Sequence, residues 1–178
     1  MDETSQRLST IRDHLTKALS SSDSQPHLSK ALNGLYAVED SESHTAIATD
    51  YIIRLLRHFL TSTNSVPSRH WAGIIIARLC RKSAESAGTF SKVPRGDWRF
   101  NLVYGLGNLI LEEGVHEDLR LICGLIIKRC VFHGVDHRIF WPAHEVHAPF
   151  PIDDGEQWTH QFYNFVRADD GLRAVRYV

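Results

Sequence analysis

The 178-residue sequence has few of the features that mark specialised protein classes. Its three cysteines, Cys80, Cys123 and Cys130, are too few and too far apart for a disulfide scaffold. They lie in apolar helical stretches, as buried thiols of a reducing compartment do. The polar N-terminus, MDETSQRLST, lacks the apolar centre of a signal peptide. The longest apolar stretch, Ala72 to Ala77, is too short to span a bilayer. We therefore expect an intracellular protein of the cytoplasm or nucleus, without membrane contact.

No charge of one sign dominates the chain. Its formal net charge is −1, so no overall field draws it to nucleic acids or acidic membranes. The charge is uneven, however: residues 1–64 sum to −2, residues 65–101 to +5 and residues 102–178 to −4. The length and the 43% hydrophobic content fit one globular domain with its own core. We interpret 1–178 as a single domain, with helical hairpins over 1–134 and a loop-rich segment with C-terminal helices over 135–178.

Convincing alternation with a period of two residues is also missing, so we predict no strand. A helical period of 3.6 recurs instead, and it predicts an all-α fold. The expected helices span residues 3–20, a short stretch after Pro26, 44–61, 68–87, 97–113, 116–132 and 154–168, with a last amphipathic piece beyond them. We expect Ser68 and Asp97 to be N-caps and Gly88 to be a left-handed terminator. Gly105, Gly107 and Gly124 predict close packing, because an interior glycine costs a helix about 1 kcal/mol relative to alanine.

Two similar segments lie 51 residues apart. Gly73 to Arg78 reads GIIIAR and Gly124 to Arg129 reads GLIIKR, each in the second helix of a helix–loop–helix pair, 44–87 and 97–133. Here the chain resembles the HEAT/armadillo family of helical repeats. The resemblance implies hairpins stacked in an α-solenoid, although the family's repeats are typically about 40–47 residues long. The alternative interpretation is an irregular helical bundle.

Basic residues gather between residues 69 and 99. This basic belt consists of Arg69, Arg78, Arg81, Lys82, Lys92, Arg95 and Arg99, with Trp71, Phe90 and Trp98 between them. Clustered cations with aromatic residues fit the backbone and bases of a nucleic acid. They fit an acidic peptide equally well. The spacing of Arg78, Arg81 and Lys82 also agrees with a plain solvated helix face, on which Arg81 can pair with Glu85.

Histidines are frequent near the C-terminal end, at His133, His137, His144, His147 and His160. Imidazole is a zinc ligand, and Asp136 or Glu145 could add oxygen ligands, so segment 133–160 is a candidate site for a metal-dependent enzyme. No His-Glu-x-x-His pattern or zinc-finger cysteine pair accompanies them, however. We therefore expect no metal and no other cofactor.

The sequence contains no glycine-rich phosphate loop and no nucleophile elbow, so we predict that the protein is not an enzyme. We predict a protein–protein interaction module, a helical scaffold domain of a larger protein or complex that binds a protein or peptide partner. The basic belt favours an acidic partner. Nucleic-acid binding is the less favoured alternative. The predicted binding residues are Arg78, Arg81, Lys82, Lys92, Arg95, Phe140, Trp141 and Trp158. The other interpretation of the aromatic residues is that they cover the open end of the helical stack.

Overall fold

Seven α-helices and one 3₁₀-helix build the computed structural model, which describes residues 2–140 apart from the side chain of Leu111. The helices are α1 (Glu3–Ser20), α2 (Gln25–Tyr36), α3 (Ser41–Leu60), α4 (Val66–Lys82), α5 (Ala84–Gly88), α6 (Trp98–Leu111), α7 (Glu117–Phe132) and the 3₁₀-helix η1 (His137–Phe140). No strand occurs in residues 2–140, which confirms the all-α prediction for this part of the chain. The helix predicted over 154–168 lies outside the described residues.

Three helices begin with an aspartate that accepts a backbone hydrogen bond. The N–H of Ser5 donates to Asp2 and that of Ser43 donates to Asp40, both over 2.6 Å. Asp97 accepts from the N–H of residue 99 over 2.9 Å, as the sequence predicts. Each carboxylate satisfies an N–H that has no partner inside the helix and lies at the positive end of the helix dipole.

The region predicted as one helix over 68–87 forms two helices instead. Ser65, not Ser68, is the N-cap of α4, and its Oγ accepts the N–H of Ser68 over 3.3 Å. At the other end Ser83 adopts an extended backbone and caps α5, accepting the N–H of Ser86 over 3.1 Å. A serine that can cap a new helix thus interrupts an otherwise continuous apolar pattern.

The left-handed glycines follow later helices. Gly88 is not the predicted left-handed terminator, because the described glycines with positive φ are Gly96, Gly114 and Gly134. Gly114 and Gly134 follow the ends of α6 and α7, where the sequence predicts a stop.

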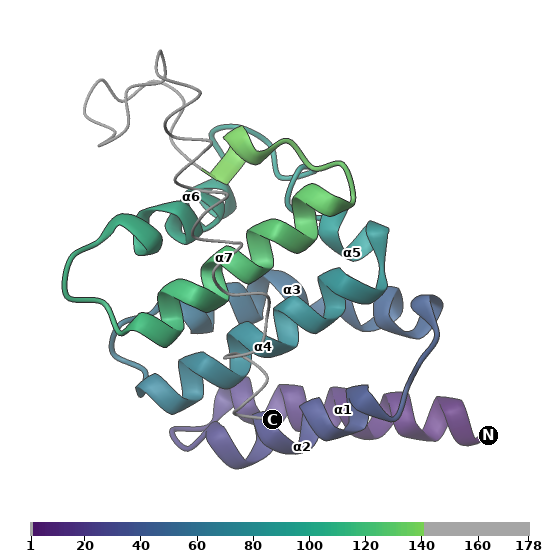
Figure 1. The fold of residues 1–178 in the computed structure, drawn as a ribbon. Helices are drawn as coiled ribbons and strands as arrows, with labels where there is room; N and C mark the ends of the chain where they lie inside the picture. Colours follow the sequence, from purple (N-terminus) through teal and green to yellow (C-terminus); the bar gives the residue numbers. More distant parts are fainter. Residues whose placement is uncertain (1, 141–178) are drawn as a thin grey trace.

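The helices form three antiparallel pairs, α1 with α2, α3 with α4, and α6 with α7 (Figure 1). The three pairs also contact one another in the order of the chain. The first helices touch in the sequence α1, α3, α6, and the second helices touch in the sequence α2, α4, α7. The described chain therefore has two layers of helices, with α4 central in the second layer.

Helices α4 and α7 run side by side with matching register. Sγ of Cys80 lies 4.0 Å from Sγ of Cys130, 50 residues further along the chain. Near the other end, a Cβ placed on Gly73 would collide with Ile122 and would lie 2.7 Å from Phe59 of α3. Pairs at a nearly constant offset mean that the two helices are parallel, and Gly73 allows the close approach.

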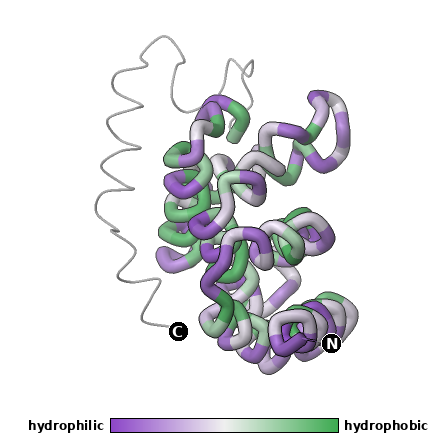
Figure 2. Tube along the Cα trace, turned by 90° about the vertical axis from the view of Figure 1, so that its right-hand side faces the viewer, coloured by the Kyte–Doolittle hydropathy of each residue, from purple (hydrophilic) through white to green (hydrophobic). Residues whose placement is uncertain are grey.

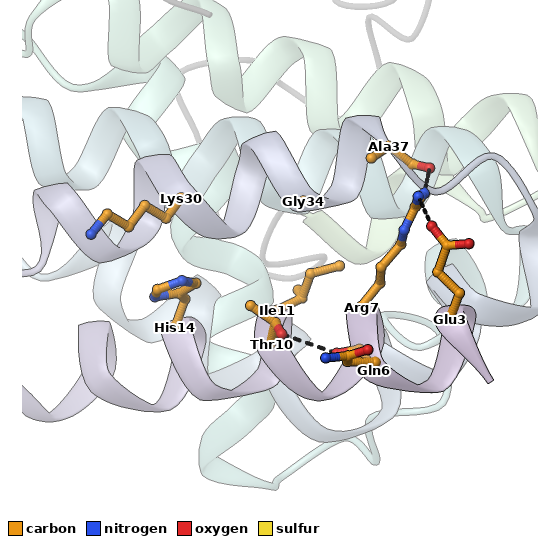
Figure 3. Close-up of a pocket in the computed structure, with 9 residues that line it drawn as sticks. All are labelled: Glu3, Gln6, Arg7, Thr10, Ile11, His14, Lys30, Gly34 and Ala37. Atoms are coloured by element: carbon orange, nitrogen blue, oxygen red, sulfur yellow. Dashed lines mark hydrogen bonds and ion pairs between the residues drawn. The ribbon is translucent and has the colours of Figure 1, made fainter. Parts of the chain in front are cut away.

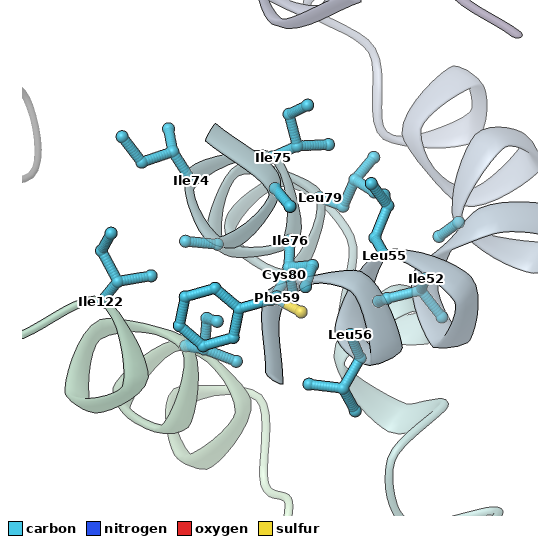
Figure 4. Packing of buried hydrophobic residues seen from close by; sticks show 14 of the residues in the cluster. Ile52, Leu55, Leu56, Phe59, Ile74, Ile75, Ile76, Leu79, Cys80 and Ile122 are labelled. Carbon is cyan, nitrogen blue, oxygen red and sulfur yellow. The ribbon is translucent and has the colours of Figure 1, made fainter. Parts of the chain in front are cut away.

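The core fills the space between the layers, with Phe59 of α3 beside Ile76 and Cys80 of α4 (Figure 4). The predicted close packing at Gly105 is confirmed, because a Cβ there would lie 2.6 Å from Cδ1 of Leu60. Within residues 2–140, no helix is both long and apolar enough to cross a membrane.

Candidate functional site: a basic cluster at the ends of two parallel helices

The structure divides the predicted basic belt into unlike parts. Arg69 is 8% exposed, and its Nε donates to the carbonyl oxygen of Phe59 over 2.7 Å. Burial lowers the pKa of Arg69. This arginine ties α4 to the end of α3 and does not belong to a binding surface. Lys92 and Arg95 are exposed in the loop that follows α5.

Arg78 is packed against its neighbours. Its side chain is 10% exposed, its guanidinium carbon lies 4.7 Å from the centre of the Tyr36 ring, and Nη2 lies 3.8 Å from Oε1 of Glu39. The prediction that Arg78 lies on a solvated face is wrong, because the end of α2 and the turn after it cover this side of α4.

Lys82 and Arg81 lie in the last turn of α4. Nζ of Lys82 donates to Oε2 of Glu39 over 2.6 Å. The hydrogen bond and the positive charge of Lys82 lower the pKa of Glu39, and Arg78 contributes further. Arg81 is exposed, as the sequence predicts.

Arg129 of α7 joins these cations. Burial lowers its pKa, and so do the nearby charges of Arg81 and Arg78. The sequence analysis missed this residue as a binding candidate, although the 51-residue offset pairs it with Arg78. We call Arg78, Arg81, Lys82 and Arg129 the basic cluster. It lies where two parallel helices end, and the negative ends of their dipoles favour cations there.

Two donors of the basic cluster have no acceptor in the described part of the chain. The Nε atoms of Arg78 and Arg129 are both buried and both lack a hydrogen-bond partner there. A buried donor without an acceptor costs about 1–3 kcal/mol, so such groups are rare. A guanidinium offers several donors in a fixed plane, which matches a carboxylate or a phosphate. The donors of this cluster therefore have the chemistry that suits an anion.

A second polar cluster, Ser24, His58 and Ser68, connects the start of α2, the end of α3 and the start of α4. Nε2 of His58 lies 2.6 Å from Oγ of Ser68 and 3.2 Å from Oγ of Ser24, and the two hydroxyls also contact each other. Burial lowers the pKa of His58, which favours the neutral imidazole as an acceptor. We call this the serine–histidine cluster. Sequence reasoning missed it, because its members are far apart along the chain.

The histidines of the candidate metal site are only partly described. His133 lies beside the end of α4, with Nε2 3.4 Å from the carbonyl oxygen of Arg81. Nδ1 of His137 lies 4.0 Å from Oδ1 of Asp136. Residues 2–140 contain no group of three histidine, cysteine, aspartate or glutamate side chains that could hold a metal ion. His144, His147 and His160 lie outside the described residues.

The structure also differs from the prediction for the aromatic residues of the binding site. Phe140 is fully buried, and its ring centre lies 5.9 Å from that of Phe90. Phe140 is therefore a core residue and not a contact for a partner, contrary to the prediction. Trp141 and Trp158 lie outside the described residues.

A shallow groove of about 380 Å³ lies between α1 and α2 (Figure 3). Arg7 crosses one end of it, donating to the carbonyl oxygen of Ala37 over 3.3 Å and pairing with Glu3. His14 and Lys30 line the other end, and the charge of Lys30 adds to burial in lowering the pKa of His14. Arg7 and Lys30 are exposed, whereas Arg78 and Arg129 of the basic cluster are partly buried, so the groove is the weaker candidate for an anion site.

No family model, no curated protein and no solved structure matches the chain.

Proposed function

We propose that the protein is a non-enzymatic interaction module of the α-solenoid type, which binds an acidic segment of a partner protein at the basic cluster. The layered contacts support the architecture, since α1, α3 and α6 follow one another in one layer and α2, α4 and α7 in the other. Stacked hairpins of a solenoid have this order. The offsets of 49 to 50 residues between contacting positions of α4 and α7 agree with the repeat read from the sequence.

One observation carries the binding proposal: the buried Nε atoms of Arg78 and Arg129 lack acceptors in residues 2–140, in a cluster of four cations. Glu39 is the acid paired with Arg78 and Lys82, and its own side chain is 75% exposed. A partner's carboxylates would satisfy the donors and balance the charge. The exposed Arg81 would then act at the rim and chiefly accelerate association.

An acidic peptide fits better than a nucleic acid. A phosphate backbone needs a continuous track of cations, whereas Arg69 is bound to Phe59 and Arg99 to Asp97. A catalytic function gains no support from the serine–histidine cluster, whose two serines are 4–5% exposed and occupied with His58. The three buried cysteines agree with an intracellular location.

The proposal is tested with two fluorescent probes of equal charge, a peptide of alternating glutamate and leucine and a single-stranded oligothymidylate. Fluorescence anisotropy measures the affinity of each for the full chain at several salt concentrations. We expect tighter binding of the peptide, and a loss of at least about tenfold for Arg81→Glu. Arg54→Glu, an equal charge reversal at an exposed position of α3, is the matched control and should change the affinity little.

Equal losses for Arg81→Glu and Arg54→Glu would show that binding reflects overall charge and would refute the site. Preference for the oligonucleotide, with a steep dependence on salt, would favour the nucleic-acid alternative.

A further inference from the structure

Phe132, the last residue of α7, is a large apolar side chain that remains in contact with solvent. It is 83% exposed, whereas Val66 and Trp98, the other exposed large hydrophobic residues of the described chain, are 37% and 57% exposed. Trp98 also stacks on Arg57, whose guanidinium carbon lies 5.6 Å from the ring centre. A single exposed apolar residue is ordinary by itself, so its neighbours decide whether it belongs to a binding surface.

The ring of Phe132 lies beside the end of α4. It meets the ring of His133 edge-on, with the ring centres 5.3 Å apart and an angle of 83° between the planes. Nε2 of His133 in turn lies 3.4 Å from the carbonyl oxygen of Arg81, in the last turn of α4. His133 therefore connects Phe132 to the helix end that carries the exposed cation of the basic cluster. We call Phe132 and His133 the aromatic edge.

Phe132 is also a neighbour of Arg129 on α7. Cys130, which contacts Cys80, marks the side of α7 that faces α4. Successive helical residues are rotated by about 100°, so from Cys130 in one direction around α7 Arg129 comes after about 100° and Phe132 after about 160°. The two positions are about 4.5 Å apart along the axis. Arg129 thus lies between the cations of α4 and the aromatic edge.

The basic cluster and the aromatic edge belong to the same end of the molecule. Helices α4 and α7 both end on the right-hand side of Figure 1, which faces the viewer in Figure 2. Hydrophilic and hydrophobic residues lie side by side in that view. The surface where the two helices end is therefore cationic with an apolar border.

The charges decide which kind of partner fits this surface. A wholly apolar partner would cover Arg81 and Arg129 without offering an acceptor to their donors, which is unfavourable. A segment with acidic residues alone would leave the ring of Phe132 in water. A segment that carries carboxylates and a large apolar side chain near them satisfies both parts, since binding surfaces combine apolar contacts with charges at their rim.

The dimensions agree with one short segment. An extended peptide advances about 3.4 Å per residue, so residues one or two positions apart can reach from Arg129 to Phe132. The carboxylate and the apolar side chain of the partner therefore have to be close in its sequence.

We infer that Phe132 is an apolar contact of the binding surface, and that the partner segment carries a large apolar side chain within a few residues of its carboxylates. Contact with Phe132 then distinguishes among acidic segments, which the cations alone bind alike. The inference rests on the proposed function, because it concerns the same surface.

The test combines two acidic peptides with variants of the full chain. Both are labelled nonapeptides of glutamate, one with a central tryptophan and the other with a central serine, so their charges are equal. Fluorescence anisotropy should show that the wild-type chain binds the tryptophan peptide about fivefold or more tightly. Phe132→Ser should abolish this preference and change the affinity for the serine peptide by less than about twofold. Val66→Ser, at the opposite end of α4, is the matched control and should keep the preference.

The outcomes separate the inference from the proposed function. An undiminished preference for tryptophan in Phe132→Ser would overturn the inference alone, because binding of both peptides would persist. Binding of neither peptide by the wild-type chain would refute the proposed function and the inference with it.

Two further measurements test whether Phe132 is free for a partner. Phe132→Ser should leave the midpoint of thermal unfolding within about 2 °C of the wild type, because the side chain is exposed. A larger decrease would show that the chain itself covers Phe132. Analytical ultracentrifugation should give the same mass for both forms, whereas a dimer lost in Phe132→Ser would show that a second copy covers it. Either result would overturn the inference.

Discussion

The two polar clusters of this protein use buried groups in opposite ways. In the serine–histidine cluster, His58, Ser24 and Ser68 satisfy one another across three helices. In the basic cluster, Arg78 and Arg129 keep buried Nε atoms without an acceptor in residues 2–140. A closed set of hydrogen bonds fixes the helices and has no capacity left for a ligand. The basic cluster keeps donors without an acceptor in residues 2–140, which is why we propose binding for the basic cluster and a structural role for the serine–histidine cluster.

The largest effect is expected at Arg78, where the basic cluster is itself structural. Arg78→Glu places a carboxylate on a nine-tenths buried side chain next to Glu39 and removes the contact with Tyr36. We expect the free energy of unfolding to fall by about 3 kcal/mol in urea titrations. Arg78→Met keeps the apolar stem and should lose clearly less. Equal losses for the two variants would mean that the lost contacts of the guanidinium, not the introduced carboxylate, decide this position.

Opening the serine–histidine cluster should have the next largest effect. Ser68→Ala removes the hydroxyl that contacts both His58 and Ser24, so these two groups keep only their longer contact of 3.2 Å with each other. The expected loss is about 1–3 kcal/mol in the free energy of unfolding, measured in urea. Thr49→Ala, at an exposed position of α3, is the control and should lose less than about 0.5 kcal/mol. A neutral Ser68→Ala would show that the cluster contributes no stability.

Lowering the pH should reduce the stability contributed by the serine–histidine cluster, by less than the two substitutions above. Burial lowers the pKa of His58 below its ordinary value of 6.5, so the unfolded chain binds a proton first as the pH falls. Stability is therefore complete above pH 6.5 and decreases as the pH falls from there toward the folded pKa.

Buried His44 and His70 have lowered pKa values as well and add to this decrease. Urea unfolding at about pH 8 and pH 5 should show it, and His58→Gln should make the difference smaller by at most about 1 kcal/mol. An unchanged difference in His58→Gln would assign the decrease to the other histidines.

The smallest effect on stability belongs to Arg81, the exposed member of the basic cluster. Arg81→Glu should change the free energy of unfolding by less than about 0.5 kcal/mol, because an exposed charge on a helix contributes little. The same variant should lose most of its affinity for the acidic peptide. A strongly destabilised Arg81→Glu would show that this residue too is structural, and the basic cluster would then have no free binding edge.

The sequence by itself determined the helices and the caps that act within a few residues. Leu28, Ala31, Leu32 and Leu35 are all buried, as the period of the pattern predicts. Asp97 caps α6 as expected. Periodicity and capping are local, because their geometry is fixed over three or four residues, and reading them requires no knowledge of the partner helices. The helix break at Ser83 was missed because a serine in an apolar pattern has two local solutions.

Only the tertiary structure decided which polar side chains are exposed. Arg78 and Arg81 have similar local surroundings in the sequence, yet one packs on Tyr36 and the other is exposed. Arg129 meets Arg78 from 51 residues away, and His58 meets Ser24 from 34 residues away. These encounters depend on which helices pack together and in what register, and helix packing is set by the summed contacts of whole surfaces. The pattern along one helix therefore predicts its apolar side but not the use of each charge on the other sides.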